Sequence, residues 1–225
     1  MTDKETGEFL LRACHDLRTS LRTVQAHAEL MGRDAAGGQE ISGIGERLGF
    51  IIDGARRMDL LVEGLVSYAI ALEIDGAEFQ MTALDIVLRS VLAKLDKELR
   101  TKDATVTYKG LPSVRADPDR LIQVFESLLR NALQFRGAES PKVHIAAEKH
   151  REGWLFSVQD NGVGIEKEYT EAAFKAFERL HGKRHPGPGL GLTICREIVE
   201  RHGGRMWMVS KAGAGTTVYF TLPED

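Results

Sequence analysis

The first third of the chain is dominated by one pattern, in which apolar residues recur at alternating steps of three and four positions. That spacing is typical of long helices that pack along a common seam, so the pattern predicts two such helices. In the first stretch the seam residues are Leu10, Cys14, Leu17, Leu21, Val24, Ala28 and Met31. In the second stretch they are Ile41, Ile44, Leu48, Ile51, Ala55, Met58, Val62, Leu65 and Ala69.

Residues 34–38, Asp-Ala-Ala-Gly-Gly, separate the two stretches and have the composition of a turn. Two helices joined in this way form an antiparallel hairpin, and a single partner helix cannot cover the whole seam. We therefore expect a homodimer in which two hairpins form a four-helix bundle. Five glycines in residues 43–64 each cost about 0.5–1 kcal/mol relative to alanine in a helix interior. They indicate either a soft second helix or sites of close helix packing.

From residue 75 onward the pattern changes to apolar helical segments mixed with short runs of β-forming residues. These runs are Thr105–Tyr108, Lys142–Ala147, Trp154–Val158, Arg205–Val209 and Thr216–Leu222. Short turns join several of them, which favours an antiparallel or mixed sheet covered by helices. The sequence therefore predicts two domains, 1–74 and 75–225.

The composition narrows the classes of function and the location. Hydrophobic residues are 43% of the chain and charged residues 28%, as in soluble folded proteins. A net charge of -3 gives no general attraction to nucleic acid. The two cysteines, Cys14 and Cys195, are far apart and match neither a disulfide framework nor a zinc-ligand spacing. Without an apolar run long enough for a bilayer, we expect a cytoplasmic protein with no direct membrane insertion.

Within the first predicted helix, residues 15–22 read HDLRTSLR. If Cys14 and Leu17 face the seam, His15 and Thr19 lie four apart on the outward face, with Asp16 beside them. An exposed imidazole becomes a nucleophile when a carboxylate orients one ring nitrogen and leaves the other free. Taken alone, the stretch fits an ordinary surface histidine better.

Residues 117–136 predict an amphipathic helix that begins with Asp117 and Pro118. Asn131 is a polar residue near its apolar stripe, and an amide oxygen can be one ligand of Mg²⁺. A capping or solvent-exposed asparagine is an equal alternative. The apolar stripe itself is formed by Leu121, Val124, Phe125, Leu128, Leu129 and Ala132.

Two glycine-containing segments complete the motifs. Residues 160–165, DNGVGI, directly follow a predicted strand, so Asp160 can accept a hydrogen bond from a donor such as the adenine amine, or the segment is only a turn. Residues 185–192, HPGPGLGL, lead into a predicted helix whose N-terminal N–H groups suit a phosphate chain. A flexible linker is the alternative there, and His181 and His185 fit surface residues better than metal ligands.

In this order, the motifs resemble the transmitter module of sensor histidine kinases over nearly the whole chain. The matching segments are HDLRTSLR (H box), SLLRNA (N box), DNGVGI (G1 box), FKAF (F box) and GPGLGL (G2 box). The C-terminal part is most similar to transmitters of phytochrome-type photoreceptors. The resemblance implies an α+β fold: an N-terminal helical hairpin forming a dimeric four-helix bundle, then an α/β sandwich of the GHKL ATPase type with a mixed sheet.

The resemblance also implies a function, which is ATP-dependent autophosphorylation of His15 and transfer of the phosphoryl group to an aspartate of a response-regulator receiver domain. Asp16 then assists proton handling, Thr19 orients water during dephosphorylation of the partner, and Asn131 holds Mg²⁺. An upstream sensor domain or sensor protein is implied as a further partner, since no sensor domain precedes Thr2. The residues implied to contact ATP are Asn131, Asp160, Gly162, Gly164, Phe174, Phe177, Gly187, Gly189, Gly191 and Thr216.

Several positions depart from the family pattern, so we expect weak autophosphorylation. Ser20 replaces a proline, Ser127 an asparagine, Gln134 a basic residue and Pro188 a small hydroxyl residue, and residues 178–186 form a short lid. Ser127 and Gln134 support the alternative of a phosphotransfer or scaffold protein with a degenerate ATP site. The preceding helices disfavour a topoisomerase-like or mismatch-repair ATPase and an anti-sigma type serine kinase.

Overall fold

A computed structural model describes residues 3–36, 43–76, 79–151, 153–178 and 188–224. The chain divides into two compact units, the first made of Met1–Val66 and the second of most of residues 67–225. In the described parts of both units, no helix combines the length and the apolar character needed to cross a bilayer.

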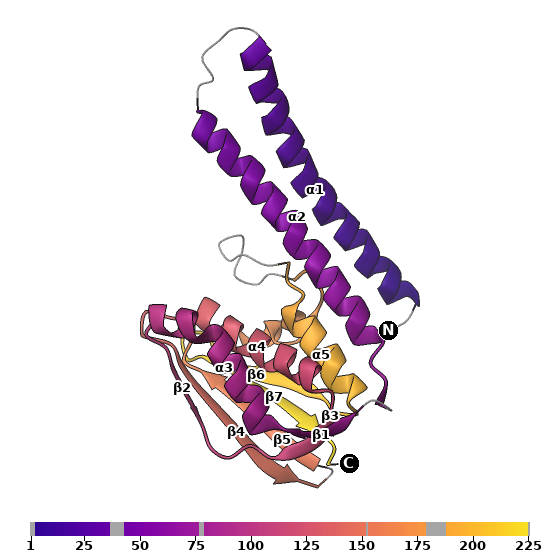
Figure 1. Ribbon diagram of the computed structural model, residues 1–225, viewed down its shortest axis with the longest axis vertical. Coiled ribbons are helices and arrows are strands. Elements are labelled where there is room, and N and C mark those ends of the chain that lie inside the picture. The colour runs from indigo at the N-terminus through magenta and orange to yellow at the C-terminus, as the bar shows by residue number, and fades with distance from the viewer. Residues whose placement is uncertain (1–2, 37–42, 77–78, 152, 179–187, 225) are drawn as a thin grey trace. The chain divides into compact units, whose positions relative to one another are not determined.

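The first unit is a helical hairpin, as the spacing of apolar residues predicts. Helix α1 spans Asp3–Ala36, and helix α2 begins at Ile44 and continues to Leu72 (Figure 1). The prediction of a turn from residue 34 is wrong, because Asp34 and Ala35 still belong to α1. Asp34 is held by an ion pair in which its Oδ2 lies 2.5 Å from Nη1 of Arg47. The remainder of the expected turn, residues 37–38, lies outside the described residues.

The inner face of α1 is one position away from the predicted seam. Phe9, Ala13 and Ser20 are buried, whereas the predicted seam residues Leu10 and Leu21 stay 54% and 45% exposed. The buried row is less apolar than the predicted one, since it includes Ser20, so the spacing of apolar residues does not show which row faces α2. The second helix also carries large exposed apolar side chains, which are Ile44, Leu48, Phe50, Ile52, Leu60, Val62, Val66 and Ile70. One hairpin therefore leaves much of its apolar surface uncovered.

One glycine of α2 marks a close contact between the two helices. A Cβ atom on Gly54 would lie 2.7 Å from Cγ2 of Val24 and 3.3 Å from the carbonyl oxygen of Ser20. Gly45 and Gly49 have open space at the same position. Gly54 is thus a packing glycine, whereas Gly45 and Gly49 carry only the entropic cost of glycine in a helix.

The second unit is built on a mixed five-stranded sheet in the order β2-β4-β5-β7-β6. Strands β2 and β4 pair in parallel, and the other neighbours are antiparallel. Figure 1 shows α3, α4 and α5 on one face of this sheet. The strands span Thr105–Tyr108 (β2), Lys142–His150 (β4), Gly153–Asp160 (β5), Met206–Ser210 (β6) and Thr216–Leu222 (β7). The helices span Leu84–Thr101 (α3), Pro118–Gln134 (α4) and Gly191–Arg201 (α5).

The structure confirms the five predicted strand segments and the mixed sheet, but it adds a second sheet. Strands β1, Gln80–Ala83, and β3, Ser113–Ala116, pair antiparallel. Neither segment, Gln-Met-Thr-Ala or Ser-Val-Arg-Ala, is a run of β-branched and aromatic residues, so the sequence gives no strand signal there. Two short 3₁₀ helices, Lys167–Tyr169 and Ala172–Phe174, precede α5.

The core lies between the helices and one face of the sheet. Alternation along the strands places Phe156 and Val158 of β5 beside Phe220 and Val218 of β7, and all four are buried. The six predicted stripe residues of α4 are buried as well. Complete burial of each large apolar side chain contributes about 1.5–3 kcal/mol, so this layer fixes the position of α4 on the sheet.

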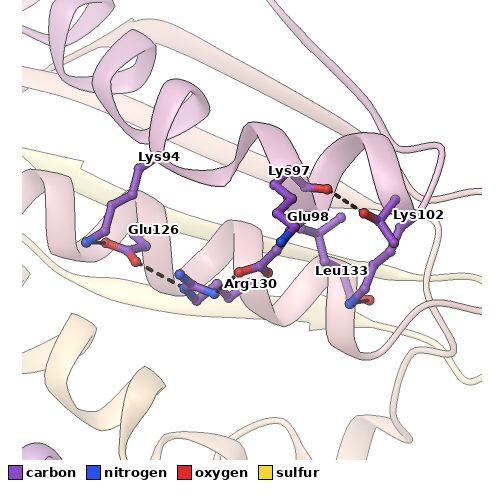
Figure 2. A network of polar contacts seen from close by, with 8 residues as sticks. Lys94, Lys97, Glu98, Lys102, Glu126, Arg130 and Leu133 are labelled. Carbon is purple, nitrogen blue, oxygen red and sulfur yellow. Dashed lines mark hydrogen bonds and ion pairs between the residues drawn. The ribbon is translucent and has the colours of Figure 1, made fainter.

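Polar contacts fix α4 at its start and along its outer side. The carboxylate of Asp117 accepts hydrogen bonds from the N–H groups of Asp119 and Arg120, which confirms the predicted cap. Figure 2 shows the outer side, where Arg130 of α4 pairs with Glu126 on the same helix and with Glu98 of α3.

Glu126 also pairs with Lys94 of α3 over 2.6 Å. Burial opposes the charge on Glu126, but hydrogen bonds from Lys94 and Arg130 outweigh it and lower the pKa of the carboxyl group. The network holds the two helices together in the part of α4 that leads to Asn131.

Candidate functional site

Asp160 lies at the C-terminal end of β5 and faces the helices. Its Oδ1 accepts hydrogen bonds from the backbone N–H of Gly162 at 2.7 Å and of Thr216 at 3.2 Å. Burial raises the pKa of Asp160, while these two hydrogen bonds act in the opposite direction. The arrangement uses one carboxylate oxygen for positioning and leaves Oδ2 as a hydrogen-bond acceptor.

Gly162 and Gly164 let neighbouring backbone segments pack closely beside Asp160. We call the region around Asp160, Gly162 and Gly164 the Asp160 corner. A Cβ atom on Gly162 would lie 2.5 Å from the carbonyl oxygen of Phe135, and one on Gly164 would lie 2.1 Å from that of Lys211. Gly164 also has a positive φ of 60°. The resemblance implies that these glycines contact ATP, and the atoms that require glycine at both positions belong to the chain itself. They shape the corner by letting its loops pack closely.

Ser210 is a residue of this corner that the sequence analysis does not identify. Its hydroxyl accepts a hydrogen bond from Ile165 N–H at 2.9 Å and donates one to Gly215 O at 3.1 Å. The same hydroxyl lies 2.8 Å from Oγ1 of Thr216. A serine at the end of a strand is too common to stand out, and only the sheet register reveals its place beside Thr216 and Asp160.

Asn131 reaches the same region from α4. The helix closes with a hydrogen bond from Phe135 N–H to Asn131 O, and Phe135 O then accepts one from Val163 N–H at 2.9 Å. The Asn131 side chain is partly buried and lies one helical turn before this junction. Among the described residues no cluster of His, Cys, Asp or Glu could hold a metal ion. An amide oxygen therefore fits Mg²⁺ only if water or phosphate provides the other ligands.

The N-terminus of α5 packs against α4 one turn before Asn131. A Cβ atom on Gly191 would lie 3.0 Å from Oγ of Ser127. No side chain caps the first turn of α5, since its N-cap residue is Leu190. The first N–H groups of α5 therefore suit an anion, and the residues present fit a phosphate chain.

Gly189 forms the turn by which the chain enters α5. Its φ is 75°, and a Cβ atom would lie 2.9 Å from the carbonyl oxygen of Glu178. Its own carbonyl accepts a hydrogen bond from Phe177 N–H at 2.9 Å, and Phe177 also has a positive φ, of 64°. Gly187, His181 and His185 lie outside the described residues.

Phe174 fastens the preceding segment to α5. Its buried ring lies under the guanidinium of Arg196, 3.8 Å from Cζ to the ring centroid. Its carbonyl accepts a hydrogen bond from Oγ1 of Thr193 at 2.9 Å. Phe174 and Phe177 thus support the start of α5 by packing and by backbone contacts.

His15 lies on α1 of the first unit, and its side chain is 77% exposed. Its Nδ1 lies 3.1 Å from Oδ1 of Asp16. When the ring is neutral and Nδ1 carries the proton toward Asp16, the lone pair of Nε2 is free to act as a nucleophile. Thr19 donates its hydroxyl proton to the carbonyl oxygen of His15 at 2.9 Å, a bond within the helix.

Comparison with known proteins finds relatives over nearly the whole chain. Residues 116–225 match the family described as histidine kinase-, DNA gyrase B- and HSP90-like ATPase. Over 223 residues, 99% of this chain and 29% of the relative, the sequence is 34% identical to cyanobacterial phytochrome A of Nostoc sp. (strain PCC 7120). Over 233 residues, 98% of this chain and 37% of the relative, it is 33% identical to the sensor histidine kinase WalK of Bacillus subtilis (strain 168). The chain spans about a third of the length of these curated relatives.

A solved structure shares the fold. The histidine kinase ThkA, in complex with the response regulator protein TrrA, matches 97% of this chain and 62% of its own, with a TM-score of 0.72 and 22% identity. At this identity the match shows a common fold, with a helical hairpin and an α/β sandwich.

Proposed function

This chain belongs to the sensor histidine kinases as a transmitter with a GHKL-type ATPase domain, and we propose that it is an ATP-dependent protein-histidine kinase core of a two-component system. In this proposal residues 1–74 are the dimerisation and histidine-phosphotransfer domain, and residues 75–225 are the catalytic ATP-binding domain. The observation that carries it is the exposed His15 imidazole, oriented by Asp16, in a chain that also forms the Asp160 corner.

His15 is the phosphoacceptor in this proposal. With Nδ1–H directed at Asp16, Nε2 forms the bond to the γ-phosphorus of ATP while the bond to the bridging β–γ oxygen breaks and ADP leaves. The positive charge that develops on the imidazole is stabilised by Asp16, which takes up the Nδ1 proton afterwards.

ATP is held by the second unit. Oδ2 of Asp160 accepts a hydrogen bond from the exocyclic amine of adenine. The uncapped N–H groups at the start of α5 donate hydrogen bonds to the phosphates. Asn131 provides one oxygen to Mg²⁺, and the metal neutralises charge on the phosphates when it is bound. We assign Thr216 to the adenine side, and Gly187, Gly189 and Gly191 to the phosphate side. Phe174 and Phe177 support that side.

The exposed apolar surface of the hairpin supports a homodimer. Leu10 and Leu21 on α1 and Leu48 and Val62 on α2 are each more than two fifths exposed in one chain. Soluble proteins bury such rows of side chains, and a second hairpin would cover them in a four-helix bundle.

A response-regulator receiver domain is the proposed phosphoryl acceptor after His15. The structural relative ThkA is found in complex with the response regulator protein TrrA. Phosphohistidine on an exposed helix face is accessible to a receiver aspartate, and Thr19 lies on that face to orient water when the module dephosphorylates its partner. We place this exchange in the cytoplasm and expect an upstream sensor domain or sensor protein to control it.

Nucleotide titration tests the ATPase side of the proposal. The chain should bind ATP in the presence of Mg²⁺, and Asn131→Ala should weaken ATP binding and remove its Mg²⁺ dependence. Arg136→Ala, five residues further along the chain, is the matched control and should bind as the unaltered chain does. A folded chain without Mg²⁺-dependent ATP binding would contradict the kinase and favour the phosphotransfer or scaffold alternative.

A further inference from the structure

Asp160, Thr216 and Ser210 lie in one row across the sheet, next to the Asp160 corner. In the register of β6 and β7, Ser210 is opposite Thr216. In the register of β5 and β7, Gln159 is opposite Thr217, so Asp160 is next to Thr216. Alternation from the buried residues Val158 and Val218 places this row on the face that the helices cover.

The hydrogen bonds of Ser210 determine where its single proton goes. The hydroxyl accepts a hydrogen bond from Ile165 N–H. Its contact with the carbonyl oxygen of Gly215 requires Ser210 to be the donor, because a carbonyl oxygen has no proton to give. The proton of Ser210 is thereby used.

The direction of the third contact follows. Between Oγ of Ser210 and Oγ1 of Thr216, 2.8 Å apart, one hydroxyl must donate. Since the Ser210 proton is directed at Gly215, the donor is Thr216. Its hydroxyl then presents only lone pairs to any other partner.

Asp160, like the Thr216 hydroxyl, offers only a hydrogen-bond acceptor to a ligand. Both backbone donors, Gly162 N–H and Thr216 N–H, are directed at Oδ1. Oδ2 remains an acceptor, as does the Thr216 hydroxyl in the neighbouring strand. The row therefore offers acceptors and no donor to a ligand beside it.

We propose that Ser210 is a positioning residue for purine specificity. It accepts the hydrogen bond that the Thr216 hydroxyl donates, and so keeps the row suited to a 6-amino purine. This inference rests on the proposed function, in which Asp160 receives the base of a nucleotide. A 6-amino group donates two hydrogen bonds and fits acceptors. A 6-oxo purine presents an oxygen there, which finds no donor and faces the Asp160 carboxylate.

The test compares ATP with inosine triphosphate, which carries a 6-oxo group in place of the amine. Both are measured on the full chain with Mg²⁺ by displacement of a fluorescent ATP analogue. In Ser210→Ala the Thr216 hydroxyl is free to turn its proton toward the 6-oxo group, so the preference for ATP should fall about tenfold. In Ser210→Thr the hydroxyl is retained and the preference should stay.

Thr221→Val is the matched control, since Thr221 Oγ1 accepts a hydrogen bond from Arg205 N–H at the far end of β7. It should leave the ratio of the two affinities unchanged. Thr216→Val is the second route, should Ser210→Ala not fold: it should weaken ATP and leave inosine triphosphate unaffected. Thermal unfolding of each variant reports folding.

The outcomes separate this inference from the proposed function. ATP binding by the unaltered chain, with both nucleotides weakened equally or neither changed in Ser210→Ala, would overturn the role of Ser210 alone. Absence of nucleotide binding in the unaltered chain would overturn both.

Discussion

Nδ1 of His15 and Oδ1 of Asp16 lie 3.1 Å apart on an exposed part of α1. The two residues are neighbours in the sequence, so the pair forms within one helix and needs no other element to align it. In the proposed reaction the carboxylate of Asp16 holds the proton on Nδ1, which leaves Nε2 as the nucleophile.

Replacement of Asp16 by asparagine tests this relationship. We expect the initial rate of histidine phosphorylation to fall about 100-fold, because the amide does not stabilise the charge that develops on the imidazole. ATP affinity should not change. The rate is measured with labelled ATP, and Asp53→Asn, at an exposed aspartate of α2, is the control. An unaltered rate in Asp16→Asn would show that the carboxylate plays no part.

Asp160→Asn should separate stability from binding. A hydrogen bond to a charged group contributes about 1.5–3 kcal/mol, so ATP should bind about 10- to 100-fold more weakly. Because burial raises the pKa of Asp160 in the folded protein, ionisation of its carboxyl disfavours folding at pH 7. The asparagine variant should therefore unfold at the same temperature as the original chain or at a higher one.

Calorimetry and nucleotide titration give the two readouts for Asp160→Asn. Asp103→Asn is a suitable control, because Asp103 accepts a hydrogen bond from Ser140 in the same unit. Loss of folding together with loss of binding in Asp160→Asn would argue against this account of the corner.

His202 should make the second unit sensitive to acid. It is buried, its Nε2 accepts a hydrogen bond from Asp117 N–H at 3.1 Å, and its ring stacks on Phe79. Burial lowers the pKa of His202 from its ordinary value of 6.5, against the opposing effects of Ile198 O and the Asp117 charge. The folded state therefore binds fewer protons than the unfolded state, and stability falls as the pH drops below about 6.5.

Unfolding midpoints between pH 5 and pH 8 measure the effect of His202. His202→Gln should remove this component of the pH dependence, and His144→Gln, at an exposed histidine of β4, should leave it in place. An identical pH profile in His202→Gln would contradict the assignment to His202.

The glycines of α2 should respond in opposite directions to alanine. Gly49→Ala should stabilise the hairpin by about 1 kcal/mol, since nothing lies within 4 Å of the new Cβ atom. Gly54→Ala should destabilise it by about 1–3 kcal/mol, because Val24 and the backbone of Ser20 occupy that space. Thermal unfolding of the two variants checks both signs, and equal shifts would rule out close packing at Gly54.

Much of the fold is predictable because it follows local periodicity. The two long helices, the α4 cap at Asp117 and the five main strands all repeat a pattern over several residues. The inner face of α1 lies one row away from the predicted seam, because the buried row has Ser20 beside Phe9 and Ala13 and so carries a weaker apolar pattern than the row of Leu10 and Leu21. Strands β1 and β3 are short and are defined by each other, so local patterns miss them.

The site is less predictable than the fold. The sequence motifs identify Asp160 and Asn131 by type and spacing, and the roles of these residues remain predictions. Ser210 has no such signal, because its position beside Thr216 depends on the register between β6 and β7. The DNGVGI motif identifies Gly162 and Gly164, and only the three-dimensional packing reveals the backbone atoms of Phe135 and Lys211 that need the space.

The most direct test is incubation of the purified chain with ATP labelled at the γ-phosphate and Mg²⁺, alongside His15→Ala and Asn131→Ala. We expect the unaltered chain to take up label slowly, and this label should be labile in acid and stable in alkali. Both variants should remain unlabelled. Label that persists in folded His15→Ala, or that is stable in acid, would contradict phosphorylation of His15.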